Sequence, residues 1–558
     1  MKEANEGVRA GRWERVQRLL NGGEPGTSQY GMARWLFVRG LGLIYLMAIV
    51  SWWTQVDGLV GERGIQPAGA FLDTVAQHFG SKGAGFLEYA PTVLWWADDV
   101  DAWLHGLCAV GVVLACFVMA GVMAGPSLLG LWVVYLSLVT TGGAFMSFQW
   151  DMLLLETGFL ALFLAPWRWY FSREDRDASR LMVFLFHWLL FRLMFFAGYV
   201  KLASGDPSWW EGTALFVHYE TQPIPNWVSW YVHQLPVWFH KLSCWMMFVI
   251  ELVFPFFIFL GRRARLVAFF GFVGLMGLIV VTGNYTYFNY LTILLCVLLL
   301  DDALWPRKWR GLEREERVTG ERGRVAGRRG RAGSPASVES EERAAKRRTP
   351  VEWGVGTARV LAACVVLPLS VMTAIDQFNR WKGGKRVAFT WPAEVQEARG
   401  LFSPFRVVGG YGLFADMTET RPEIEIEGSE DGVTWKPYRF GWKSDELDRR
   451  PRFVAPHQPR LDWQMWFEAL TAERVGGAID PRRQGGWFVP FLLRLLEGSE
   501  PVMGLLRENP FPEGPPRYVR ARVYRYEFSE PEAKRDAGEW WDREYLFEYV
   551  PSISVRRG

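Results

Sequence analysis

The stretch FFAGYVKLASGDPSWWEGTAL, residues 195 to 215, carries an apolar helix that ends on Lys201 and then enters a segment rich in tryptophan. An apolar run of this kind is typical of a helix that crosses a membrane. A lysine ammonium in bilayer hydrocarbon is costly, so it must be solvated, paired or used chemically. Lys201 is therefore the first candidate for a functional residue.

The composition around this stretch is that of a membrane protein. Of the 558 residues, 50% are hydrophobic and 30 are tryptophan, well above the usage of soluble globular domains. The net charge of +3 gives no nucleic-acid-binding footprint, so no nucleic-acid partner is expected. All five cysteines lie inside apolar runs, which indicates neither a disulfide framework nor a zinc site.

Nine runs approach the roughly 20 apolar residues that cross a bilayer as a helix. They lie near residues 33–53, 104–124, 127–146, 149–166, 182–202, 241–260, 265–283, 285–300 and 354–375. The sequence therefore predicts an α-helical multi-pass membrane domain over residues 31–305, with a last transmembrane helix at 351–376. In total we expect about nine transmembrane helices.

The loop charges predict the topology. The polar segment 1–30 has no apolar core of a signal peptide, so the first span is expected to direct insertion with the N-terminus in the cytoplasm. The segment 306–350 holds fourteen Lys or Arg against seven Glu, which predicts a disordered basic cytoplasmic linker. An odd number of spans then places residues 377–558 in the lumen or periplasm.

This C-terminal region has the period of β-strands. EIEIEGSEDGVTWKPYRF, residues 423–440, alternates apolar and polar residues across an Asp-Gly turn, which is a hairpin signal. RYVRARVYRYEF, residues 517–528, has the same period of two. We expect a β-rich, sandwich-like extracytoplasmic domain over residues 377–558.

Charged residues gather at one depth of the membrane domain. At 1.5 Å per residue, Asp151 lies near the level of Lys201, and Glu156 lies in depth between Lys201 and Arg192. The hypothesis is that Lys201 pairs with Asp151 or Glu156, and Arg192 with Glu156 or Glu251. These residues form either a structural ion-pair network or a catalytic group in which Lys201, Asp151 and Glu156 are the candidates.

The tryptophan-rich loop 205–240 is interrupted by four prolines and predicts short interfacial helices that form a lid over the charged cluster. The lid candidates are Trp209, Trp210, Glu211 and His218. The turn TGNYTYFNYL, residues 282–291, adds Asn284 and Asn289 to the polar cluster. The histidines of the loop match no compact ligand set, so no metal site is expected.

Several ordered runs resemble the lipase maturation factor family. They are GLVGERGIQPA (58–68), FQWDMLLLETGFLALFLAP (148–166), HYETQPIPNW (218–227), TGNYTYFNYLTI (282–293), PHQPRLDWQMWFEAL (456–470) and NPFPEGPPRYVRA (509–521). The resemblance implies a multi-pass protein that, in eukaryotic members, resides in the endoplasmic reticulum membrane. It also implies help in the folding and assembly of homodimeric lipases.

The run RLDWQMWF mixes charge with large rings, a composition suited to recognition of a client protein. The client-recognition candidates are Arg460, Asp462, Trp463, Gln464 and Trp466. The alternative is a buried polar clasp in which Arg460 satisfies Asp462 and the rings pack against the rest of the protein. Tyr411, Gly412, Leu413 and Phe414 are expected to form a turn that docks the sheet on the membrane domain.

The membrane half alone also resembles, more distantly, the vitamin K-dependent γ-carboxylase, or HTTM, superfamily. GYVKLASGDPSWWEGTAL is similar to the segment in which that family's catalytic lysine acts as base on vitamin K hydroquinone, and Lys201 matches this lysine. The sequence departs from the pattern in having one lysine where that family has two adjacent ones.

Two functions from different classes follow. The first is a maturation factor, with no cofactor, that acts as a folding or assembly chaperone for exported clients such as lipases in contact with membrane lipid. Its compartment is the endoplasmic reticulum by resemblance, or the plasma or inner membrane if the source is bacterial. The alternative is a carboxylase-like membrane enzyme that uses Lys201 as base on a quinone-type cofactor. A transporter is a third reading, although the spans show no internal repeat.

Overall fold

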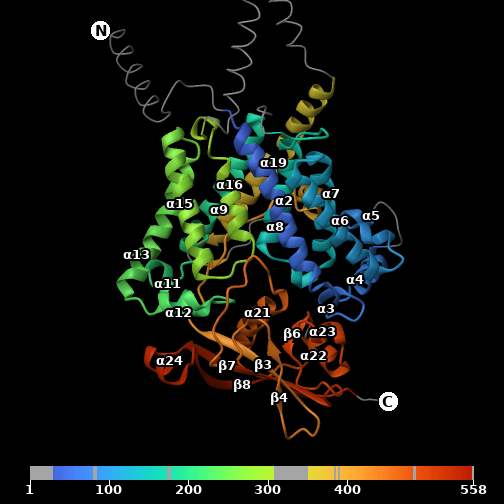
Figure 1. Ribbon diagram of the computed structural model, residues 1–558, viewed down its shortest axis with the longest axis vertical. Helices are drawn as coiled ribbons and strands as arrows, with labels where there is room; N and C mark the ends of the chain where they lie inside the picture. Colours follow the sequence, from blue (N-terminus) through green and yellow to red (C-terminus); the bar gives the residue numbers. More distant parts are fainter. Residues whose placement is uncertain are drawn as a thin grey trace, which may run out of the picture.

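The computed structural model describes residues 29–79, 85–172, 178–306, 350–382, 385–386, 390–481 and 485–555. Figure 1 shows a bundle of long helices with the C-terminal domain packed on one end. The predicted cytoplasmic segment 1–30 and the predicted disordered linker 306–350 lie almost entirely outside the described residues. We call the end that carries the C-terminal domain the domain end, and the opposite one the free end.

Seven helices within the described ranges are long and apolar enough to cross a membrane. They are α2 (Gly31–Trp53), α6 (Val100–Ala120), α7 (Ala124–Thr141), α9 (Arg180–Ala203), the continuous stretch Val237–Phe257, α15 (Arg262–Thr282) and residues Gly354–Arg380 of α19 (Pro350–Arg380). The stretch Val237–Phe257 comprises α13 (Val237–Phe248), a π-helical turn η3 (Val249–Val253) and α14 (Phe254–Phe257).

The two remaining predicted spans are shorter than a bilayer crossing. Residues 149–166 form α8 (Gln149–Leu164), of 16 residues, and residues 285–300 form α16 (Phe288–Val297), of 10 residues. Most of α8 is buried by protein on all sides, so its apolar residues are core residues that need not face lipid. Hydropathy alone therefore predicts about nine spans, whereas seven of the described helices are long enough to cross a membrane.

Short helices lie between the long helices along the chain. They are α3 (Val56–Val60), α4 (Ala68–Phe79), α5 (Gly85–Tyr89), α10 (Pro207–Trp210), α11 (Ala214–Thr221) and α12 (Trp227–His233). The last three occupy the predicted lid segment, where Asp206 caps α10 and Asn226 caps α12 through their side chains. Residues 205–240 therefore contain short helices, as predicted.

The C-terminal domain contains antiparallel sheets, as expected. The main sheet has the order β4-β3-β7-β8, and its strands are β3 (Arg421–Ser429), β4 (Lys436–Pro437), β7 (Tyr518–Phe528) and β8 (Trp541–Ile553). Both predicted strand regions are confirmed, since β3 and β4 form the hairpin and β7 pairs with β3 with Ile424 opposite Val523. Two small sheets pair β1 (Trp381–Lys382) with β2 (Lys385–Arg386) and β5 (Arg439–Phe440) with β6 (Leu506–Glu508).

Helices cover the main sheet where a sandwich would place a second sheet. The helices of this domain are α20 (Ala393–Phe402), α21 (Arg460–Val475), α22 (Phe488–Glu497), α23 (Glu500–Met503) and α24 (Pro531–Ala537). Helix α21 packs on β3 and α22 on β7, and Figure 1 shows α21 between the sheet and the membrane helices. The apolar side of the sheet is thus buried against helices, which period-two strand patterns do not reveal.

Candidate functional site

A buried ion pair joins the two domains. The Arg460 guanidinium at the start of α21 donates to both carboxylate oxygens of Asp151 on α8, each at 2.9 Å, and both side chains are fully buried. Tyr135 and Tyr287 donate hydroxyl hydrogen bonds to the same carboxylate at 2.5 and 2.7 Å. A bidentate pair of this kind fixes orientation as well as distance. It therefore sets how α21 sits on the membrane domain.

This pair changes the interpretation of the RLDWQMWF motif. Arg460, Asp462, Trp463, Gln464 and Trp466 are all buried, so they form no exposed recognition surface in this structure. The buried-clasp alternative also needs correction, because Arg460 pairs with Asp151 and not with Asp462. Asp462 instead accepts the backbone N–H groups of Trp442 and Lys443, while burial raises its pKa to about 6.

Further contacts across the domain boundary were missed by the sequence analysis. Arg421 on β3 donates to the backbone oxygens of Glu220, Gln222 and Pro223 beside the lid helices. The side chain of Asn284, predicted for the polar cluster, lies in this boundary instead. It bonds with Ile224, Arg452, Val454 and Ala455. The sequence offered one signal for Arg421, namely a charged residue at the start of a predicted strand.

The predicted docking turn has the expected role. Tyr411 donates its hydroxyl hydrogen bond to Glu156 at 2.6 Å, and the backbone N–H of Gly409 donates to the same carboxylate at 2.7 Å. Arg192 pairs with the other oxygen of Glu156 and donates to the Gly409 carbonyl at 3.0 Å. The pairing of Arg192 with Glu156 is therefore confirmed. The pair also holds the turn of the C-terminal domain.

Lys201 has a different partner from either one predicted. Its ammonium lies 2.8 and 3.1 Å from the two carboxylate oxygens of Glu251 in η3, and it donates to the Ala197 carbonyl at 3.0 Å. The pairing with Asp151 or Glu156 is wrong, because those carboxylates are taken by Arg460 and Arg192. Trp209 of the lid places its ring 5.4 Å from the Lys201 nitrogen.

Local backbone features bring Lys201 and Glu251 together. Gly198 lies one turn before Lys201 on α9, and a Cβ there would come within 2.9 Å of the Glu251 Cβ. A glycine at this point lets η3 approach α9 closely. The π-helical turn adds a residue to the helical repeat and so changes the direction in which Glu251 points.

The Lys201–Glu251 pair lines a cavity of about 250 Å³ at the domain end. Helices α9, α15 and α16 and the stretch Val237–Phe257 form its walls, and lid residues Trp209 and His218 close it together with Phe414. Asn289 also lines the cavity, and its buried Oδ1 has no hydrogen-bond partner within the described structure. Most other lining side chains are apolar. Trp210 and Glu211, by contrast, are exposed and do not line this cavity.

Comparison with known proteins identifies the family. A model of the lipase maturation factor transmembrane domain matches residues 32–307, and a model of the lipase maturation factor C-terminal domain matches residues 407–551. Lipase maturation factor 2 of Homo sapiens is 34% identical over 617 residues, which cover 94% of this chain and 83% of the human protein. This chain belongs to the lipase maturation factor family.

Other members of the lipase maturation factor family match at similar levels. Lipase maturation factor 2 of Gallus gallus is 35% identical over 94% of this chain and 81% of its own length. Lipase maturation factor 1 of Bos taurus is 33% identical over 95% of this chain and 91% of its own length. No solved structure matches the chain. The family membership and the apolar helices together make this a multi-pass membrane protein.

Among the described residues of this family member, no three His, Cys, Asp or Glu side chains are close enough together to hold a metal ion. His218 accepts or donates one bond with the Tyr285 hydroxyl at 3.1 Å, and burial, reinforced by the charge of Lys201, lowers its pKa to about 4. A neutral histidine, a neutralised ion pair and an unpartnered amide oxygen together can bind a small polar group within an apolar cavity.

Proposed function

We propose that this chain is a membrane maturation factor that assists the folding, assembly or maturation of exported client proteins such as dimeric lipases. Membership of the lipase maturation factor family supports this function. The proposed orientation follows the positive-inside rule, with the N-terminus in the cytoplasm and the C-terminal domain in the lumen or periplasm. The proposed compartment is the endoplasmic reticulum membrane, or the plasma or inner membrane in a bacterium.

The state of Lys201 is the observation that carries the proposal. A lysine that acts as general base needs a free electron pair directed at its substrate. The Lys201 nitrogen instead lies within hydrogen-bond distance of three oxygens of its own chain, all at 3.1 Å or less. Its position favours a structural charge in the cavity wall over the carboxylase-like chemistry of the alternative function.

A client would then meet the C-terminal domain on a surface other than the buried α21 motif. We propose the edge of the main sheet, because β8 is the last strand in the order β4-β3-β7-β8 and its Tyr545 is 52% exposed. An edge strand offers backbone N–H and C=O groups to an extended segment of a partner. A folding client exposes segments of that kind before its own strands are paired.

The test is the specific activity of a secreted dimeric lipase from cells that lack their own maturation factor. Cells receive the parent chain or the double variant Lys201→Met with Glu251→Gln, which removes both charges and keeps the side-chain lengths similar. We expect both chains to restore lipase activity equally per mass of chain in the membrane. Lipase activity with the parent alone, at equal abundance, would place chemistry at Lys201 and overturn its assignment as a structural charge.

A second comparison tests the client surface. Tyr545→Glu on β8 is expected to lower the recovered lipase activity severalfold with an unchanged thermal midpoint of the maturation factor. Val433→Asp is the matched control, because Val433 is 81% exposed at the tip of the β3–β4 hairpin and lies off the β8 edge. Equal activity with both variants would contradict a role for the edge strand. Failure of the parent chain itself would exclude lipases as clients.

A further inference from the structure

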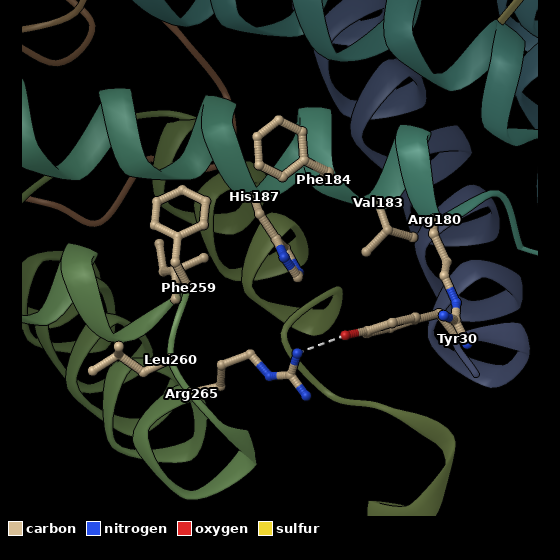
Figure 2. A pocket seen from close by; sticks show the side chains of 9 residues that line it. Tyr30, Arg180, Val183, Phe184, His187, Phe259, Leu260 and Arg265 are labelled. Carbon is tan, nitrogen blue, oxygen red and sulfur yellow. Dashed lines mark hydrogen bonds between the residues drawn. The ribbon is translucent and has the colours of Figure 1, made fainter. Parts of the chain in front are cut away.

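A second cavity lies near the free end of the bundle, remote from Lys201. It has a volume of about 310 Å³, and α9, α15 and the start of α2 contribute to its walls. Figure 2 shows Arg180 beside Tyr30, which Arg265 reaches by a hydrogen bond, while Phe184 and Phe259 lie on the other side of the cavity. The cavity therefore has a cationic side and an apolar side.

One guanidinium on the cationic side, that of Arg265, keeps a nitrogen without a hydrogen-bond partner among the described residues. Arg265 donates to the Tyr30 hydroxyl at 2.7 Å and to Asp301 at 3.1 Å, while its buried Nε has no partner in the part of the chain that the structure describes. The Asp301 carboxylate also accepts from Arg262 at 2.7 Å, so two guanidinium groups share this one carboxylate. An added anion would therefore find partial positive charge at Arg265 and a further guanidinium at Arg180.

The helix ends add to this potential. Helix α9 begins at Arg180 and α15 at Arg262, and within the described ranges neither has a side-chain hydrogen bond at its N-cap. The free N–H groups of a helix N-terminus carry partial positive charge and attract anions. By contrast, α2 is already capped, because Asp302 accepts the N–H groups of Gly31 and Met32. The N-terminus of α9, where Arg180 lines the cavity, thus adds partial positive charge to that of the side chains.

The apolar side is open to the surroundings of the bundle. Phe184, Phe259 and Leu260 are 43%, 43% and 47% exposed, at the end of membrane-spanning helices. Large apolar side chains at this level contact lipid chains. A ligand that fits both sides carries an anionic oxygen-rich head and apolar chains joined to it.

We propose that this cavity binds the phosphate of an anionic glycerophospholipid, with the acyl chains lying along Phe184 and Phe259. Basic pockets between membrane helices are suited to such head groups, since guanidinium groups match phosphate oxygens in geometry and charge. The bound lipid joins the ends of α9 and α15 through a shared anion. This role is independent of the client function.

The test measures binding of a fluorescent short-chain phosphatidylglycerol to the purified full chain in detergent, with phosphatidylcholine and inorganic phosphate as competitors. We expect phosphatidylglycerol to bind at least about fivefold more tightly than phosphatidylcholine. Arg180→Gln should weaken phosphatidylglycerol about fivefold and leave phosphatidylcholine unchanged. Arg180 is exposed, so this change should alter the free energy of unfolding only slightly, as is usual for a surface substitution.

Two further variants complete the design. Arg263→Gln is the matched control, because Arg263 is exposed on α15 and does not line the cavity, and it should bind like the parent. Leu260→Glu places a negative charge at the cavity while Arg180 is kept. This variant should bind phosphatidylglycerol more weakly than the parent does. Equal affinity for both lipids, or equal effects of Arg180→Gln and Arg263→Gln, would overturn the proposal. Displacement by inorganic phosphate at matched concentration would show a site for the free anion and would also overturn it.

Discussion

Two of the buried ion pairs described above, Asp151–Arg460 and Lys201–Glu251, use charge in different ways. Asp151 and Arg460 are 309 residues apart in the chain, belong to different domains and are enclosed on all sides. Lys201 and Glu251 are 50 residues apart, lie within the membrane domain and border a cavity. The first pair fixes the position of one domain on another. The second neutralises the wall of a cavity, and its loss should therefore be tolerated better.

The largest effect should come from breaking the interdomain pair. Arg460→Met leaves Asp151 buried without a cation, which should lower the free energy of unfolding by about 3–5 kcal/mol. The thermal midpoint in detergent should fall, and limited proteolysis should cut the C-terminal domain at lower protease concentration. Arg474→Met on the exposed side of α21 is the control, with an expected change within about 0.5 kcal/mol.

Adding Asp151→Leu to Arg460→Met should recover much of this loss, because the pair is then replaced by apolar side chains and no lone charge remains. If the double variant is no more stable than the single one, the carboxylate is held by other groups and the pair is not the main tie between the domains.

A smaller loss is expected at the cavity. Lys201→Met leaves Glu251 without its cation, but the cavity gives the carboxylate room for water, so we expect about 2–3 kcal/mol. The double variant Lys201→Met with Glu251→Gln should be closer to the parent. Thermal midpoints of the three proteins test this. A loss as large as that of Arg460→Met would remove the distinction between the two pairs.

The docking turn should show an effect of about 1–2 kcal/mol. Gly412 has φ of +145°, and a Cβ there would lie 2.8 Å from a Val200 methyl, so Gly412→Ala should strain the turn. Gly410→Ala is the matched control, since its Cβ would meet Thr373 at an ordinary 3.5 Å. Equal unfolding free energies for the two variants would show that the turn yields without strain.

The smallest effect concerns pH. Burial raises the pKa of Glu220 from 4.5 to about 7, although it accepts the N–H of Phe528 at 2.8 Å. The folded protein therefore holds a proton between pH 4.5 and 7 that the unfolded chain has lost. The stability contributed by Glu220 is full below pH 4.5 and is lost as the pH rises to about 7.

Glu220→Gln should remove this slope, because the amide does not ionise and its oxygen can still accept the Phe528 N–H. The measurement is the thermal midpoint of parent and variant from pH 4.5 to 7.5, and their difference isolates Glu220 from Asp462. Parallel curves would contradict the raised pKa.

The sequence predicts depth in the membrane better than direction around a helix. A rise of 1.5 Å per residue is enough to match Arg192 with Glu156, which are paired in the structure. The same estimate of depth does not identify Glu251 as the partner of Lys201. Glu251 lies in a π-helical turn, where the 3.6-residue period no longer gives the direction of a side chain. The close approach at Gly198 depends on the packing of two helices, which no single segment encodes.

Strand patterns were similarly informative about local structure and silent about layers. The Asp-Gly hairpin and the period of residues 517–528 predict β3, β4 and β7. The same alternation would be compatible with any apolar layer packed on the sheet, whether strands or helices. Here that layer consists of α21 and α22. The partner of Asp151 was within reach of the sequence, since a buried carboxylate needs a cation and Arg460 stands in an aromatic motif. The choice between Arg460 and Lys201 required the fold.

The separation of Asp151 and Arg460 along the chain also has a consequence in time. Ribosomes add roughly 5–20 residues per second. With 309 residues between the two partners, Arg460 is added about 15 to 60 s after Asp151, whereas Tyr287 follows Asp151 by 136 residues and Tyr135 precedes it. During that interval the membrane half exposes an unmatched acid, and a nascent chain stalled or truncated before α21 carries it permanently. The charge of Asp151 is thus matched by Arg460 only after α21 has been synthesised.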